Sequence, residues 1–239
     1  MKVFRITALL MLGLLVASCA TTTTRTHPTL SDQLHHVNSV VIVPPRVEIE
    51  YVTLTGENER MPDQEGVIRS QLLTIAEREL RTHGYEVVPF DFDEALTEDN
   101  ELAYLVTQVR EGFDNAKEDM SLGKQISVEK ASTLAISVGE AANIIAARTG
   151  ADAILVMRYS GFDKSDGYVA KDVGTSLLVG ILTMGQVIPL SATSGAFTEC
   201  ALIDGMTGEI LWADVKGGML NASVADSAMD SLPDDVDPG

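Results

Sequence analysis

The stretch ADAILVMRYSGF, residues 151–162, decides the fold. Residues 153–157 form an unbroken apolar run, and Gly150 stands immediately before the stretch. A short apolar run that begins beside a turn residue is typical of a strand buried inside a sheet. It is the strongest strand signal in the chain, so we expect a β-sheet to be built around it.

Two alternating stretches downstream predict a β-hairpin at the end of the folded body. AFTECALID (196–204) and EILWADV (209–215) flank GMTG (205–208), which supplies a glycine-containing turn. Cys200 lies in the first of these stretches. We interpret it as a small buried core residue rather than as a reactive thiol; a disulfide with Cys19, the only other cysteine, stays open.

Upstream of 151–162, the pattern predicts a strand, a helix and a second strand. NSVVIVPP (38–45) is a β-branched run that two prolines end. A helix is expected from Asp63 as N-cap to Gly84 in the C-cap position, followed by YEVVPF (85–90) as a strand. Two further helices carry apolar residues at helical spacing: Leu102, Leu105, Val106 and Val109 in one, and Val138, Ala142, Ile145 and Ala146 in the other.

This order of elements predicts an α/β (α+β) sandwich. We expect one mixed β-sheet of about four to five strands, with helices packed on it and a C-terminal β-hairpin. The predicted domain spans 38–217. No basic residue follows Lys216, so 218–239 is expected to be an acidic disordered tail.

The charge balance excludes one class of partner. The chain carries 17 basic and 35 acidic residues, a formal net charge of −18. Nucleic-acid binding needs a clustered basic face that neutralises phosphates, and no such cluster is present in the sequence. We therefore expect no nucleic-acid partner.

The first nineteen residues have the layout of a secretory signal. Lys2 and Arg5 precede a short apolar run that ends in small residues. That run is too short to span a membrane, which takes about 20 apolar residues. Residues 1–18 are therefore predicted to be removed as a signal peptide.

The end of this signal, Val16-Ala17-Ser18-Cys19, resembles the lipobox of bacterial lipoproteins. The resemblance implies that Cys19 is the lipid attachment site and the mature N-terminus; an ordinary signal peptide with a coincidental cysteine is the alternative. Ala20 after the cysteine implies sorting to the outer membrane. Residues 19–37 lack apolar periodicity and are expected to be a flexible tether.

An uncharged, glycine-containing insertion lies between the last two strand regions. Residues 173–190 carry no charge. The segment is a poor membrane span because glycine and polar residues dilute it, which leaves a buried core element or an exposed element that contacts a partner, a second copy or the membrane. The candidate contact residues are Leu177, Leu178, Val179, Ile181, Leu182 and Met184.

Motifs for catalysis are weak. Ser127 and Lys130 match a Ser-x-x-Lys pattern of acyltransferases that act on cell-wall peptides, so a cell-wall hydrolase or acyltransferase is the alternative function. Asp91, Asp93 and Glu94 suit either a hard cation or the N-terminus of a helix, and the helix is favoured. We expect no enzyme activity, metal or cofactor.

GADAILV (150–156) and ALIDGMTGEILW (201–212), together with the lipobox, resemble the curli-secretion-channel and penicillin-binding-protein-activator group of outer-membrane lipoproteins. The resemblance spans about 38–217. It implies a non-enzymatic domain that faces the periplasm and binds or assembles with other envelope proteins, either as a single chain or as a homo-oligomer. The channel formers of that group use long amphipathic hairpins, and 173–190 lacks their alternation.

Overall fold

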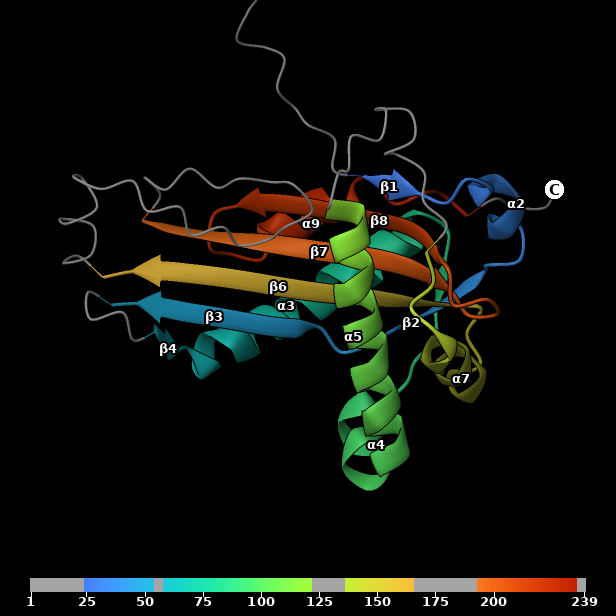
Figure 1. Cartoon of the computed structure of the whole chain (residues 1–239), viewed down its shortest axis with the longest axis horizontal. Coiled ribbons are helices and arrows are strands. Elements are labelled where there is room, and N and C mark those ends of the chain that lie inside the picture. Colours follow the sequence, from blue (N-terminus) through green and yellow to red (C-terminus); the bar gives the residue numbers. More distant parts are fainter. Residues whose placement is uncertain (1–23, 54–57, 122–135, 166–192, 236–239) are drawn as a thin grey trace, which may run out of the picture.

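The computed structural model describes residues 24–53, 58–121, 136–165 and 193–235 (Figure 1). The described strands are β1 (Arg25–Thr26), β2 (Ser39–Ile42), β3 (Arg46–Val52), β4 (Asn58–Arg60), β5 (Glu86–Val87), β6 (Ala153–Lys164), β7 (Ser194–Asp204) and β8 (Ile210–Gly218). The described helices are α2 (Leu30–Leu34), α3 (Pro62–Thr82), α4 (Phe92–Glu98), α5 (Asn100–Ser121), α7 (Glu140–Thr149) and α9 (Ser223–Met229).

β6, the strand predicted from residues 151–162, lies at the centre of a mixed sheet. It pairs antiparallel with β7 along one edge, and its other edge pairs in parallel first with β2 and then with β3. The longest path through the sheet runs β1-β8-β7-β6-β2-β5, and β4 pairs with β3. The sheet has eight strands, so the prediction of four to five is too low. Pro44 and Pro45 end β2, yet the chain resumes beside the same neighbour as β3.

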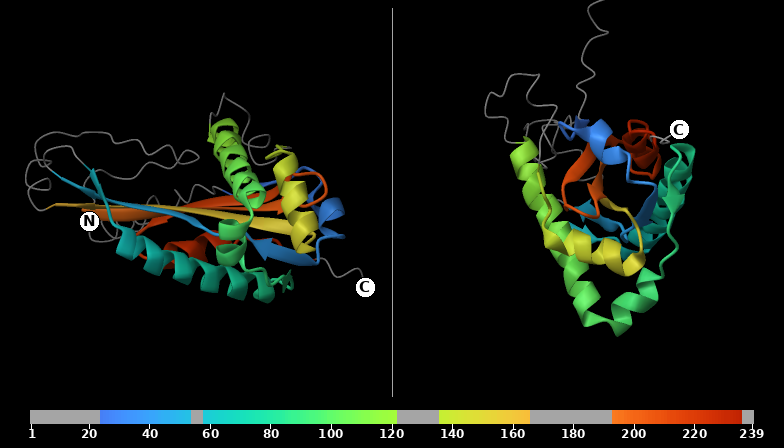
Figure 2. Two further views of the ribbon diagram at one scale, coloured as in Figure 1. Left: turned by 90° about the horizontal axis from the view of Figure 1, so that it is seen from below. Right: turned by 90° about the vertical axis from the view of Figure 1, so that its right-hand side faces the viewer.

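The two faces of the sheet carry separate helix layers, so the predicted sandwich is confirmed. Leu155 and Met157 of β6 point into the core that includes side chains of α3 and α9. Ile154 and Val156 point the other way, into the core formed with α5 and α7. Figure 2 shows the sheet between these helices. Strand alternation therefore builds two cores from one strand.

Several local predictions are confirmed. α3 ends before Gly84, which has a positive φ of 94°, and α7 ends at Gly150 with a φ of 74°. β7 and β8 form the expected hairpin. Cys200 is a free, fully buried thiol in the described structure. α3 begins at Pro62, with Met61 rather than Asp63 as its N-cap.

The prediction of a flexible tether is wrong for 24–37. β1 pairs with β8, with Thr26 opposite Trp212, and the next backbone amide, of His27, donates to Leu211 O at 2.8 Å. Leu34 of α2 is also buried. The segment is polar in sequence but adds an edge strand to the sheet, so it belongs to the folded domain.

The prediction of a disordered tail is likewise wrong for 218–235. α9 buries four side chains against the sheet, Val224, Ala225, Ala228 and Met229. Further on, Pro233 O accepts a hydrogen bond from the Tyr85 hydroxyl at 2.9 Å. Asp230 and Asp234 of this segment are exposed, while its small apolar residues complete the core.

Candidate functional site

Most site residues suggested by the sequence lie outside the described residues. This holds for Cys19, for Ser127 and Lys130, and for the whole apolar insertion with Leu177, Leu178, Val179, Ile181, Leu182 and Met184. In the part of the chain that is described, no helix is long and apolar enough to cross a membrane.

The acidic residues near the start of α4 cap that helix. Asp91 Oδ1 accepts a hydrogen bond from the Glu94 backbone amide at 3.0 Å, which is N-cap geometry. Across the described ranges, no three histidine, cysteine, aspartate or glutamate residues gather as metal ligands would. The helix interpretation of Asp91, Asp93 and Glu94 therefore accounts for their positions.

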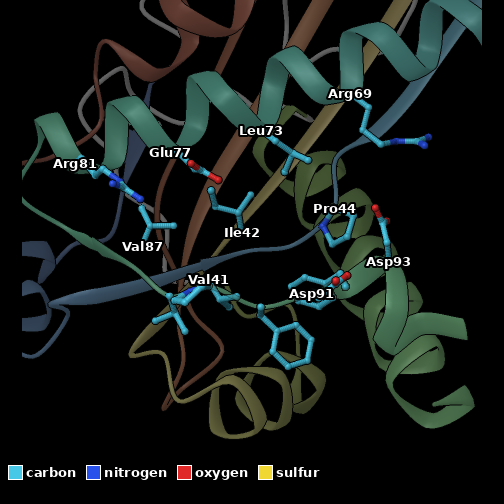
Figure 3. A pocket seen from close by; sticks show the side chains of 14 residues that line it. Val41, Ile42, Pro44, Arg69, Leu73, Glu77, Arg81, Val87, Asp91 and Asp93 are labelled. Carbon is cyan, nitrogen blue, oxygen red and sulfur yellow. The ribbon is translucent and has the colours of Figure 1, made fainter. Parts of the chain in front are cut away.

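A groove lies at the edge of the sheet where β2 ends, and we call it the edge groove. It has a volume of about 550 Å³ and opens between α3, β5 and the start of α4 (Figure 3). Its floor is apolar and consists of Val41, Ile42, Pro44, Leu73, Val87, Val88, Pro89, Phe90 and Phe92. Its rim is charged and consists of Arg69, Glu77, Arg81, Asp91 and Asp93.

One face of α3 forms a whole side of the edge groove. Arg69, Leu73, Glu77 and Arg81 follow one another at intervals of four residues, which places them along one side of the helix. Arg69 and Arg81 are 12 residues apart, so they are separated by about 18 Å along the helix axis. The groove therefore carries a positive side chain toward each end of its α3 side.

Two arginines hold the proline break next to the groove. Arg69 of α3 donates from Nε to Pro45 O at 3.3 Å, and Arg110 of α5 donates from a terminal nitrogen to Pro44 O at 2.7 Å. Because α3 and α5 belong to the two different cores, the arginines reach the break from opposite faces of the sheet. They satisfy carbonyl groups that leave the regular sheet pattern at this point.

These arginines differ from most others in the described residues. Five described arginines lie within ion-pair distance of a carboxylate: Arg46, Arg60, Arg78, Arg148 and Arg158. Within the described ranges, Arg69, Arg81 and Arg110 lie outside ion-pair distance of a carboxylate, although the charge of Arg69 helps to lower the pKa of Glu65. Burial, and then the positive charges of Arg46 and Arg69, lower the pKa of Arg110. The rim of the edge groove also carries Glu77, Asp91 and Asp93, so it presents charges of both signs, with the arginines on the α3 side.

A self-contained ionic cluster lies nearby on the α5 side of the sheet. Asp114 of α5 bonds to Arg46 at 3.2 Å and to Arg158 at 3.1 Å, and Glu48 bonds to the same two arginines at 2.9 and 3.4 Å. Burial opposes ionisation of Glu48, but bonds and charges from Arg46 and Arg158 outweigh it and lower its pKa. Its charges are paired, so this cluster fixes α5 to β3 and β6 rather than offering a free site.

The edge groove was not predicted from the sequence. Two prolines after an apolar strand were a visible signal for a strand end, but they did not show that β3 would return to β6. Arg69 and Arg110 come from helices far apart in the chain and meet only at Pro44 and Pro45.

No known protein family and no curated protein sequence matches this chain. Among solved structures, it is similar to the lipoprotein GNA1162 from Neisseria meningitidis, at 12% identity and a TM-score of 0.31 over 82% of this chain and 99% of that one. It is also similar to the PelC dodecamer from Paraburkholderia phytofirmans, at 13% identity and a TM-score of 0.33 over 89% of this chain and 96% of that one. The LpoB C-terminal domain from Salmonella enterica is similar at 15% identity and a TM-score of 0.26, over 82% of this chain and 96% of that one. At these TM-scores the similarity assigns neither a function nor a partner to this chain.

Proposed function

We propose that this chain is a lipid-anchored, non-enzymatic binding protein of the bacterial cell envelope, and that it binds a segment of another envelope protein in the edge groove. The groove itself carries the proposal, because it combines an apolar floor with Arg69 and Arg81, which lie outside ion-pair distance of a carboxylate in the described structure. The lipobox-like sequence before Cys19 supports the anchor and an outer-membrane, periplasm-facing location.

The α3 side of the groove is long enough for an extended polypeptide segment. An extended chain advances about 3.3 Å per residue, so the roughly 18 Å between Arg69 and Arg81 corresponds to five or six residues. Apolar side chains of such a segment would pack on Leu73 and Val88, and carboxylates would pair with the two arginines. The partner segment is therefore expected to be short, extended and acidic toward its ends.

The test places a photo-cross-linking amino acid at Leu73 in the full chain and irradiates intact envelopes. A discrete adduct with one envelope protein is expected, and it should weaken at least several-fold when Arg69 and Arg81 are both changed to Glu. Tyr104 on α5, which is 62% exposed and does not line the groove, is the control position. Equal adducts from Leu73 and Tyr104, or no effect of the charge reversal, would contradict groove binding.

The lipid anchor is tested separately. Cys19→Ala should abolish incorporation of radiolabelled palmitate and leave an unprocessed precursor or a soluble periplasmic form. Cys200→Ala is the control, because Cys200 is fully buried in the domain and should leave labelling unchanged. Absence of palmitate from the unaltered chain would remove the anchor from the proposal.

The insertion 173–190 stays a predicted second contact, with a partner or with another copy of the chain. Changing Leu178, Ile181 and Leu182 to Ser should abolish partner capture and leave the melting temperature nearly unchanged. A large fall in melting temperature would instead identify the insertion as part of the core.

A further inference from the structure

Thr24, the first residue that the structure describes, is fixed to the sheet. Its hydroxyl donates to Asp214 Oδ2 at 3.1 Å, and Asp214 is fully buried in β8. The same carboxylate accepts a hydrogen bond from the Ser231 hydroxyl at 2.6 Å and lies 3.2 Å from Lys216 Nζ. The backbone pairing of β1 with β8 follows immediately. Thr24 is therefore held to the sheet by its side chain as well as by the strand that follows it.

The distance from the anchor to this point is short. Cys19 and Thr24 are separated by five residue steps, which span at most about 18 Å even when fully extended. The tether predicted over 19–37 would have allowed more than three times that reach. Folding of 24–37 onto the sheet removes most of it.

The edge groove lies at the other side of the sheet from this attachment point. The path β1-β8-β7-β6-β2-β5 has β1 at one end and β5, which lines the groove, at the other. Five inter-strand steps of about 4.8 Å give roughly 24 Å across the sheet. Two views agree that β1 and the start of α4 are on opposite sides of the molecule (Figures 1 and 2).

We propose that the acylated chain stands edge-on to its membrane, with the β1 edge held against the lipid head groups and the edge groove directed away from them. This inference rests on the proposed lipid anchor and deepens the proposed function. Without Lys2 and Arg5 the acylated chain has 15 basic and 35 acidic residues, a formal charge of −20, so anionic head groups oppose membrane contacts of the body beyond those that the anchor enforces. The groove's partner is then a water-exposed protein segment beyond the anchoring bilayer, not a lipid or a membrane-embedded helix.

The stance is measurable with nitroxide labels on the full acylated chain in phosphatidylethanolamine–phosphatidylglycerol vesicles that contain a nickel-chelating lipid. Ser31→Cys places a label on α2 near β1, and Glu98→Cys places one on α4; both positions are exposed. Cys200 is fully buried, and Cys19 carries the lipid, so only the introduced thiol is labelled.

Spin relaxation by head-group nickel should be several-fold stronger at Ser31→Cys than at Glu98→Cys. A 20-residue Gly/Ser insertion after Thr22 should lower the Ser31→Cys value toward that of Glu98→Cys, because a flexible linker removes the constraint. Equal relaxation at the two sites in a vesicle-bound, acylated chain would overturn the stance. A chain that is neither acylated nor vesicle-bound would overturn the anchor itself, so the two failures are distinguishable.

Discussion

Asp214 links the two ends of the described chain. Its carboxylate receives hydroxyl donors from Thr24 before β1 and from Ser231 after α9, and the side chain is fully buried. Removing a buried acceptor leaves its donors without a hydrogen-bond partner, which costs about 1–3 kcal/mol of folding free energy. At the scale of single residues, this is the contact most directly tied to the anchor geometry.

Asp214→Ala should therefore lower the free energy of unfolding by about 2–3 kcal/mol and release β1 before the rest of the sheet. Urea denaturation gives the first quantity, and hydrogen exchange at the His27 amide gives the second. Asp32→Ala, at an exposed position of α2, is the control and should change stability by less than about 0.5 kcal/mol. Unchanged exchange at His27 in Asp214→Ala would show that β1 is held by other contacts.

Glu48 predicts a pH dependence. Its pKa lies below the ordinary value of 4.5 in the folded chain, so its ion pairs stabilise the fold above that value. This contribution is lost as the pH falls through the folded pKa. Glu48→Gln should be less stable than the unaltered chain at pH 7, by up to about 1 kcal/mol because the site is partly solvated, with the gap closing as the pH falls below 4.5.

Chemical denaturation at several pH values measures this gap. Glu59→Gln on β4 is the control, since Glu59 is exposed and makes no ion pair with another described residue. A gap for Glu48→Gln that stays constant from pH 7 to pH 3 would assign the effect to packing instead of charge.

At the scale of elements, the sequence predicted the strands and helices that have a clear apolar pattern of their own. β6, the β7–β8 hairpin and the apolar faces of α5 and α7 were readable because each pattern lies within one segment. β1 was missed because it has two polar residues and pairs with β8, far along the chain. α9 was missed because its four small apolar residues stand among acidic ones, and they are buried only against the core that includes α3. The edge groove was missed for the same reason, since Arg69 and Arg110 converge on Pro44 and Pro45 only in three dimensions.

Replacing two helical glycines by alanine should change the stability in opposite directions. A Cβ at Gly112 of α5 would clash with the backbone oxygen of Val138, whereas a Cβ at Gly66 of α3 would meet nothing within 4 Å. Alanine favours helix over glycine by up to about 1 kcal/mol. Gly66→Ala should therefore raise the free energy of unfolding by about 0.5–1 kcal/mol, and Gly112→Ala should lower it, as urea denaturation will show. Stabilisation by Gly112→Ala would mean that α5 can shift away from Val138 at no cost.

At the scale of the whole molecule, the sheet joins both cores and both ends of the described chain. β6 and β7 contribute side chains to each core, so neither helix layer has a sheet of its own. Trp212, the only tryptophan, is fully buried in β8 opposite Thr26 of β1, and its Nε1 donates to Ser231 Oγ at 3.3 Å. Its fluorescence therefore reports the edge at which the N- and C-terminal segments meet.

Because the cores share their strands, the domain should unfold in one transition. Trp212 fluorescence and far-ultraviolet circular dichroism should give the same urea midpoint and the same slope. Ser231→Ala removes the partner of Trp212 Nε1 and should move both curves together by about 1 kcal/mol. A fluorescence transition at lower urea than the dichroism transition would show that the β1 edge opens independently. An edge that opens so readily would lengthen the tether beyond five residue steps and weaken the edge-on stance, so this measurement links folding cooperativity to orientation at the membrane.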